Sequence, residues 1–330
     1  MKDAVIVALG RSAIGKAPKG VFRLSRPEDI GAQVLSGVLK QVPQLDARHI
    51  DDVIVGCAFP EAEQGMNLAK IVISKAIPGV DIPGQTVNRF CSSGLQTIAT
   101  AANAIMAGQA EGIIAGGIEL MSTIPMGGNI VAPNPDLIQS QPDAYTAMGI
   151  TAENVAEQYG VTRRMQDEFS MESHRRANAA RTEGKFAQEI IPVEAVTTYV
   201  DETGHTRMGL RTVAEDEGIR PQTTMESLGK LHTVFKLGGT VTPGNSSQTS
   251  DGAAFVILMS GEKAAELGVR PIAKFISFAV AGVPSELMGI GPIAAIPKAL
   301  KIAGLRQEDM DIIELNEAFA AQSLACINTL

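Results

Sequence analysis

One cysteine lies at the junction of an apolar segment and an alanine-rich segment. Residues 85–90 predict a β-strand, and residues 95–106 predict a helix that follows almost without a loop. Cys91 falls between them, where free backbone N–H groups and the positive end of a helix dipole can stabilise a thiolate. Residues 92–94, Ser-Ser-Gly, leave room for an acyl group. The segment suggests a cysteine that carries an acyl group as a thioester. A small buried thiol fits the local sequence equally well.

The composition limits what the rest of the chain can be. Its 330 residues suffice for about two domains. An apolar content of 45% with 33 glycines and few aromatic residues is typical of an α/β protein. The net charge of −8 argues against nonspecific nucleic-acid binding. The three cysteines, Cys57, Cys91 and Cys326, lack CxxC spacing, which argues against a zinc site or a disulfide framework and for a reducing compartment.

The sequence shows no membrane or targeting signal. No apolar run is long enough for a transmembrane helix. The first residues lead directly into a strand-like segment, residues 4–9, which leaves no room for a signal or transit peptide. We therefore expect a cytoplasmic protein without a membrane-inserted part and without a nucleic-acid partner.

Strands and helices alternate in the first third of the chain. The predicted strands there are residues 4–9, 51–55, 85–90 and 112–117, and the predicted helices are residues 25–40, 67–76 and 95–106. This order predicts right-handed crossovers on a mostly parallel sheet.

The middle of the chain has a different amino-acid composition. Residues 119–239 are polar and rich in Pro, Gly and Met, and we interpret them as an inserted subdomain. Within it, residues 151–159 and 163–183 predict helices, and residues 197–217 predict irregular structure. After it, the predicted strands are residues 253–259, 272–280 and 311–315, and the predicted helices are residues 296–303 and 318–328.

An internal repeat divides the chain into two halves. Residues 45–59 align without gaps on residues 305–319, with Leu, Asp and Ala-Phe recurring in register. The repeat predicts two similar α/β halves with the insert between them. By this alignment, the second half lacks the counterparts of the third strand and of the cysteine helix. Such a half-sheet would have an unpaired edge, so we expect the chain to be incomplete at its C-terminus.

Six segments, taken together, resemble the thiolase family, which comprises acetyl-CoA acetyltransferases and 3-ketoacyl-CoA thiolases. They are NRFCSSGLQ (88–96), AGGIELMS (115–122), MGITAENVA (148–156), GTVTPGNSSQTSDGAA (239–254), GPIAAIPKAL (291–300) and NEAFAAQ (316–322). They follow the order of the family over essentially the whole chain. The segment around Cys91 is more similar to the 3-ketoacyl branch than to the acetoacetyl branch.

The resemblance implies a fold and a reaction. The fold is α/β, with two βαβαβαββ halves in αβαβα layers and an inserted loop domain that binds coenzyme A (CoA). It implies an N-terminal half at residues 1–118 plus 240–268, the loop domain at 119–239 and an incomplete C-terminal half at 269–330. The reaction is thiolysis of a 3-ketoacyl-CoA by CoA, or the reverse Claisen condensation, with no permanently bound cofactor. The resemblance also implies a homodimer or a homotetramer.

The resemblance assigns roles to individual residues. Cys91 would be the acylated nucleophile, Asn316 would hold an oxyanion-hole water, and Glu317 would orient the site. Ser247 would lie near the pantetheine and Arg220 near the nucleotide of CoA. The tunnel for pantetheine and acyl group would be lined by Met148, Leu228, Phe235, Ala318 and Phe319. A thiol suits thioester exchange, and the oxyanions formed during exchange need prepositioned donors.

Two motifs of the family are absent from these 330 residues. The family uses a histidine in GHPxG to activate the nucleophile and a second cysteine in CxGGG as acid and base. Because loss of a positioned acid or base costs about 10²–10⁴-fold in rate, we expect weak activity from this chain. The alternative is a non-catalytic CoA-binding or scaffold protein, or a truncated remnant.

Some chemically capable side chains have plainer interpretations. We expect Cys57 and Cys326 to pack in the core and His174 to lie on the surface. Glu119 follows a predicted strand, which favours a structural role. Asn88 either holds backbone in the loop that positions Cys91 or makes a simple hydrogen bond at the strand end.

Overall fold

The computed structural model describes residues 2–330, which form two compact units. Unit 1 comprises Met1–Val131, Phe186–Gly218 and Thr249–Phe275, and unit 2 comprises Ala132–Lys185, Ile219–Gln248 and Ile276–Leu330. Neither unit is continuous in sequence. Within residues 2–330, none of the helices combines the length and the apolar character needed to span a bilayer.

A seven-stranded sheet forms the centre of unit 1. Its strands are β1 (Ala4–Arg11), β2 (Gly15–Lys16), β3 (Asp52–Gly56), β4 (Gly84–Val87), β5 (Gly112–Leu120), β8 (Ser250–Ser260) and β9 (Ala273–Lys274). The order is β4-β3-β5-β8-β1-β9, with β2 paired to β8. Strand β3 is parallel to β4 and β5, and because β1, β2 and β5 are each antiparallel to β8, strands β1 to β5 all run in one direction. The strands predicted in the first third of the chain are therefore parallel to one another, whereas the sheet as a whole is mixed. The reason is β8, which enters from the distant segment after the insert and runs antiparallel to both β5 and β1.

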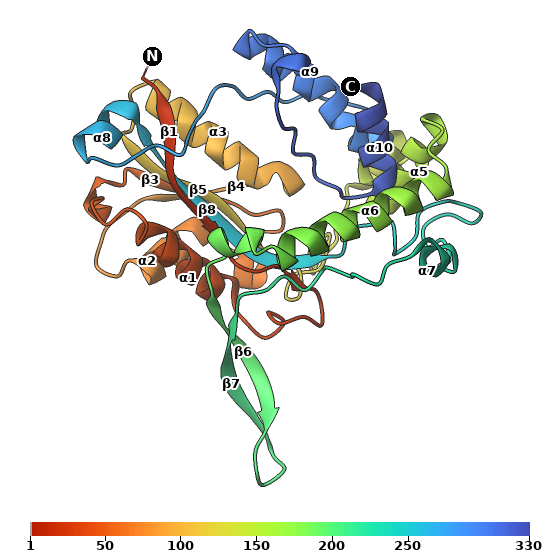
Figure 1. Cartoon of the computed structure of the whole chain (residues 1–330), viewed down its shortest axis with the longest axis horizontal. Coiled ribbons are helices and arrows are strands. Elements are labelled where there is room, and N and C mark those ends of the chain that lie inside the picture. Colours follow the sequence, from red (N-terminus) through yellow and green to blue (C-terminus); the bar gives the residue numbers. More distant parts are fainter. Residues whose placement is uncertain (1) are drawn as a thin grey trace. The chain divides into compact units, whose positions relative to one another are not determined.

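Helices cover both faces of this sheet. The helices α1 (Pro27–Leu39) and α2 (Leu68–Ala76) lie on one face, and α3 (Ser93–Met106) lies on the other (Figure 1). Side chains of β3 alternate accordingly: Val53 and Val55 join the core under α1 and α2, and Ile54 joins the core under α3. Because both faces are buried, the central strands are continuous apolar runs, and each buried side chain contributes roughly 1.5–3 kcal/mol. The short helix α8 (Gly261–Glu266) completes unit 1.

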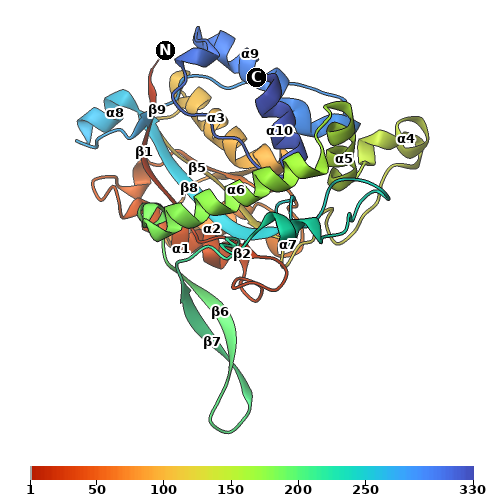
Figure 2. The ribbon, with the colours of Figure 1, turned by 45° about the vertical axis from the view of Figure 1, so that its right-hand side comes forward.

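A β-hairpin extends away from the sheet of unit 1. Its strands are β6 (Val193–Val200) and β7 (Thr206–Val213), and both ribbon views show it projecting from the body of the unit (Figure 1, Figure 2). The prediction of irregular structure over residues 197–217 is therefore wrong. Asp201 closes the turn by accepting hydrogen bonds from the N–H groups of Thr203 and His205, and cross-strand pairing then outweighs the polar composition.

Unit 2 consists mainly of helices. They are α4 (Pro135–Ser140), α5 (Met148–Gln158), α6 (Arg163–Thr182), α7 (Met225–Gly229), α9 (Gly291–Ala303) and α10 (Ala320–Thr329). Val155 of α5 and Ala321 and Ala325 of α10 form its small core. The four helices predicted in this part of the sequence are confirmed, and α6 begins where Thr162 caps the N–H of Met165.

Of the strands predicted at residues 272–280 and 311–315, the first is much shorter than predicted and the second is absent from the described part of the chain. Of residues 272–280, only Ala273–Lys274 pairs, at the edge beside β1, and residues 311–315 form no strand. A strand exists only where a neighbour supplies its hydrogen bonds, and the repeat partner of β3 finds none here. Ile312 is accordingly exposed. The three-domain division remains a prediction.

Candidate active site

Cys91 lies at the predicted junction, in a single 3-10 turn, Phe90–Ser92, directly before α3. Its thiol is free and the residue is exposed. The turn is tied to its neighbours by two serines: Ser92 Oγ donates to the carbonyl of Arg89 at 2.9 Å, and Ser93 Oγ donates to that of Phe90 at 2.6 Å. Phe90 has a positive φ of 45°, a conformation that non-glycine residues rarely adopt. The turn therefore holds Cys91 on a constrained backbone.

The pKa of the Cys91 thiol is raised, whereas the start of a helix is expected to lower it. Loss of solvent around the sulfur raises the pKa of the Cys91 thiol, a backbone N–H lowers it, and the Glu119 carboxylate raises it further. Desolvation outweighs the backbone donor, so the thiol is the favoured form at neutral pH. Reaction of this thiol as a nucleophile would therefore need a base or an approaching substrate.

The pH dependence of alkylation follows from these directions. We expect the rate at which iodoacetamide labels Cys91 to keep rising with pH past the pKa of an ordinary cysteine, about 8.5, because only the thiolate reacts. Cys57 is the internal control: it is buried, and burial with the neighbouring Glu119 raises its pKa to about 12. Peptide mapping after timed labelling measures both rates. A plateau for Cys91 below pH 8, or equal labelling of the two, would contradict the assignment.

Four residues predicted to line the CoA tunnel lie together in unit 2. The rings of Phe235 and Phe319 meet edge to face with centroids 6.2 Å apart. Gly149, the residue after Met148, lies directly beneath the Phe235 ring, and a Cβ there would collide with it. Ala318 precedes Phe319. Residue 149 and residues 318–319 therefore lie next to Phe235 in unit 2.

Ser247 is held against the same segment through its backbone. Its N–H donates to the carbonyl of Ala318 at 2.8 Å, and Ala320 N donates to the carbonyl of Asn245 at 3.0 Å. Ser246 and Phe319 form a β-bridge between these contacts. The Ser247 side chain is exposed. The antiparallel contact therefore places Ser247 next to Ala318 and Phe319.

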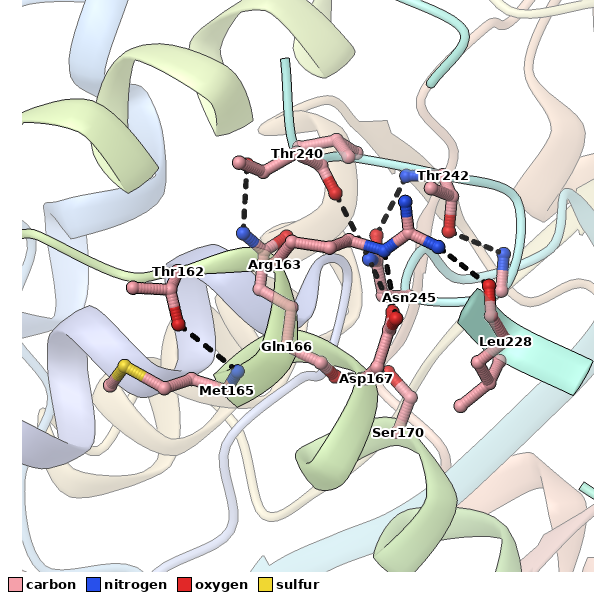
Figure 3. A network of polar contacts seen from close by, with 12 residues as sticks. Thr162, Arg163, Met165, Gln166, Asp167, Ser170, Leu228, Thr240, Thr242 and Asn245 are labelled. Atoms are coloured by element: carbon pink, nitrogen blue, oxygen red, sulfur yellow. Dashed lines mark hydrogen bonds and ion pairs between the residues drawn. The ribbon is translucent and has the colours of Figure 1, made fainter. Parts of the chain in front are cut away.

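A buried polar network supports the loop that carries Ser247. Asp167 of α6 accepts from Arg163 Nε at 2.8 Å and from Asn245 Nδ2 at 3.0 Å, and its side chain is 4% exposed (Figure 3). Arg163 also donates to the carbonyl of Leu228 at the end of α7, while Gln166 donates to Thr240 Oγ1. Because buried polar groups are costly when unpaired, this network fixes the loop with respect to α6 and α7.

A second buried carboxylate holds the start of the same loop. Glu153 of α5 is 3% exposed and accepts from the N–H groups of Thr240 and Val241 at 2.8–3.0 Å. Charge-assisted hydrogen bonds to backbone N–H groups are strong and directional. The MGITAENVA segment therefore holds the backbone of the GTVTPGN segment through Glu153. Neither segment by itself indicates this contact.

A charged cluster surrounds Glu317 in unit 2. Ser173 Oγ donates to Glu317 Oε2 at 2.5 Å, and the backbone N–H of Arg220 donates to His174 Nδ1 at 3.3 Å. Burial and the Arg220 cation lower the pKa of His174, while Glu317 raises it. The prediction that His174 is an ordinary surface residue is wrong: it is half-buried beside Arg220. No local sequence signal indicates this, because its neighbours come from distant segments.

The remaining predicted residues lie in the same unit. Asn316 is exposed, and its backbone carbonyl accepts from Gln322 Nε2 at 3.3 Å. Leu228 is buried under the loop. Cys91 belongs to unit 1 and all other predicted site residues belong to unit 2. Cys57 and Cys326 are buried, in agreement with a packing role. Among residues 2–330, no group of three His, Cys, Asp or Glu residues could hold a metal ion.

Family comparisons cover nearly the whole chain. The model of the thiolase N-terminal domain matches residues 4–262, and that of the thiolase C-terminal domain matches residues 269–330. The chain belongs to the thiolase family. It is 51% identical to the 3-ketoacyl-CoA thiolase of Bacillus subtilis (strain 168), covering 100% of this chain and 84% of the relative. It is 45% identical to the 3-ketoacyl-CoA thiolase of Saccharophagus degradans (strain 2-40), covering 100% of this chain and 82% of that relative.

A solved structure shows the same fold. The crystal structure of the Bacillus anthracis acetyl-CoA acetyltransferase superposes with a TM-score of 0.87 at 35% identity, over 99% of this chain and 83% of that one. The thiolase-like α/β fold predicted from the motifs is therefore confirmed. Family and fold together place the protein in the acyltransferase class of enzymes.

Proposed function

We propose that the protein catalyses acyl-CoA C-acyltransfer through an acyl-cysteine on Cys91: thiolysis of a 3-ketoacyl-CoA by CoA, or the reverse Claisen condensation. The supporting observation is the free, exposed Cys91 at a strand–helix junction in a chain 51% identical to a 3-ketoacyl-CoA thiolase. In the fatty-acid-degrading direction, CoA and a 3-ketoacyl-CoA are consumed and two acyl-CoA molecules are formed.

The proposed reaction has two steps. The Cys91 sulfur attacks the 3-keto carbon, the bond between carbons 2 and 3 breaks, and the released carbon 2 takes up one proton to give acetyl-CoA. This proton equals the one that the Cys91 thiol lost on attack, so the first step is balanced. In the second step, the CoA thiol attacks the acyl-cysteine and forms the shortened acyl-CoA, and Cys91 regains its proton. Both tetrahedral intermediates carry an oxyanion that needs prepositioned donors.

We assign CoA binding to residues of unit 2. The apolar side chains of Met148, Phe235, Ala318 and Phe319 suit a pantetheine arm, and the Ser247 hydroxyl suits its amide groups. Leu228 supports this loop from beneath. The exposed Arg220 suits the nucleotide phosphates. In the same proposal, Asn316 holds the water that stabilises an oxyanion and Glu317 orients the segment.

A second candidate is a CoA-binding protein without turnover. It is favoured by one observation, that the 330 residues contain neither GHPxG nor CxGGG. Such a chain would bind CoA in unit 2 and would show no thiolysis. A thiolysis assay beside a CoA titration separates the two candidates. For assembly we propose a homodimer or a homotetramer, which light scattering measures directly.

The acyl-enzyme itself provides the test of the proposed function. The protein is mixed with acetyl-CoA or with a 3-ketoacyl-CoA, quenched in acid and analysed by intact mass and peptide mapping. We expect one acyl group per chain, on the peptide that contains Cys91, and its removal when free CoA is added. Absence of the adduct, or an adduct on Cys57 or Cys326, would refute the proposed nucleophile.

A further inference from the structure

A carboxylate at the end of β5 holds the loop that follows β3. Glu119 Oε2 accepts from the N–H of Ala58 at 2.6 Å, and Glu119 Oε1 accepts from Gln64 Nε2 at 2.7 Å. Gln64 is fully buried, and its Oε1 accepts from the N–H of Leu120 at 2.6 Å. The buried thiol of Cys57 makes a long contact of 3.8 Å to the same carboxylate. Glu119 and Gln64 thus fix each other and fix the Ala58 peptide.

The Ala58 peptide is hydrogen-bonded to Asn88, which leads to the 3-10 turn that contains Cys91. Its carbonyl accepts from Asn88 Nδ2 at 2.8 Å, and Asn88 Oδ1 accepts from the N–H of Phe90 at 2.8 Å. Of the two roles open to Asn88 from the sequence, the structure therefore shows the one that holds neighbouring backbone. A second contact runs in parallel, because the rings of Phe59 and Phe90 pack with centroids 6.1 Å apart. Glu119 is therefore connected to the residue before Cys91 by three consecutive hydrogen bonds.

The conformation of Phe90 explains why such a connection is needed. Its φ of 45° lies in the left-handed region, where a side chain with a Cβ is strained, and the residue is exposed, so little core packing holds it. Such a conformation persists only where surrounding contacts determine it. If Phe90 relaxed to a negative φ, the N–H and the sulfur of Cys91 would both change direction. A carboxylate close to the nucleophile also opposes the thiolate, so electrostatics gives no reason for Glu119 here, whereas geometry does.

We propose that Glu119 and Gln64 are positioning residues for acyl transfer at Cys91: they fix the Ala58 peptide and, through Asn88, hold Phe90 in the conformation that aims the nucleophile. This inference rests on the proposed function, since it assumes that Cys91 is acylated. It adds two side chains that act on Cys91 through the Ala58 peptide and Asn88.

The test compares two reactions of the same thiol in Glu119→Gln. The new side-chain amide N–H₂ group would face another donor, Gln64 Nε2, so residues 119 and 64 would move apart. We expect the rate of Cys91 acylation by acetyl-CoA to fall about 10–100-fold, because a misplacement of about 1 Å has effects of this size. Alkylation of Cys91 by iodoacetamide at neutral pH should be unchanged or faster, because a negative charge near the thiol is removed. A merely structural role would slow or speed both reactions alike and would expose Cys57 to labelling.

Two further variants complete the design. The exchanged double variant Glu119→Gln with Gln64→Glu restores a donor opposite an acceptor and should recover part of the acylation rate. Glu111→Gln, an exposed carboxylate immediately before β5, is the matched control and should leave both rates unchanged. The inference is overturned if E119Q is acylated at the wild-type rate, or if acylation and alkylation fall together with labelling of Cys57.

The two proposals fail in distinguishable ways. If the wild-type chain is not acylated at all, the proposed function fails. The positioning contact is then judged by hydrogen exchange at the amides of Phe90 and Cys91. Faster exchange of these two amides in E119Q, with exchange in β5 unchanged, supports the contact, and equal exchange refutes it.

Discussion

Replacing Cys91 by alanine is expected to abolish the acyl-enzyme, with a fall in acyl transfer of at least about 10³-fold, while the fold is retained. The side chain is exposed at the start of α3, so its removal leaves no buried cavity. Serine at this position can accept an acyl group only as an ester, which CoA cleaves far less readily than a thioester, so Cys91→Ser should stop after a slow first step. Intact mass and thiolysis rates measure both effects.

The control for this experiment is the buried cysteine of α10. Cys326 lies in the core of unit 2 and its Sγ contacts the carbonyl of Gly289 at 3.6 Å. We expect Cys326→Ala to lower stability modestly, as for other small losses in a core, and to leave acylation of Cys91 at the wild-type extent. A Cys91→Ala chain that still forms an acyl adduct would disprove the assignment.

Replacing Asp167 by alanine is expected to destabilise the chain by roughly 2–4 kcal/mol and to weaken CoA binding about tenfold or more. The carboxylate is buried, and its loss leaves the Arg163 guanidinium and the Asn245 amide without their partner. The estimate lies below the full cost of breaking a buried pair because Arg163 is partly exposed. The loop before Ser247 then loses its attachment to α6. Thermal unfolding and a CoA titration measure the two effects, and the melting temperature should fall by several degrees.

A matched control lies one residue away on the same helix. Glu168 pairs with Arg164 at i and i+4, but both side chains are largely exposed, and such pairs contribute little. We expect Glu168→Ala to leave the melting temperature and the affinity for CoA close to wild type. If Asp167→Ala lowers stability without changing CoA affinity, the loop does not contribute to the CoA site.

Local sequence patterns were sufficient to predict the elements that flank Cys91. The apolar run before Cys91, the alanine-rich run after it and the strand at residues 112–117 correspond to β4, α3 and β5. β5 is buried along almost its whole length and α3 buries one face, so a continuous apolar run and a helical apolar period specify these two elements strongly. The family motifs, in their order, determined the thiolase fold and placed Cys91 at a strand–helix junction.

Pairing between distant segments was decided only by the tertiary structure. Residues 206–213 become a strand because β6 lies opposite, and residues 311–315 form none because no neighbour supplies a ladder. The same reason applies to the polar groups. The type of a polar residue does not indicate its hydrogen-bond partner. Local sequence therefore could not predict the contact of His174 with Arg220 or the hydrogen bonds that connect Glu119 to Asn88. The sequence by itself determined the family and the elements that flank Cys91. Only the tertiary structure decided which carboxylates and amides hold the turn of Cys91 and the loop of Ser247, because the partners in a hydrogen bond are close in space and need not be close in sequence.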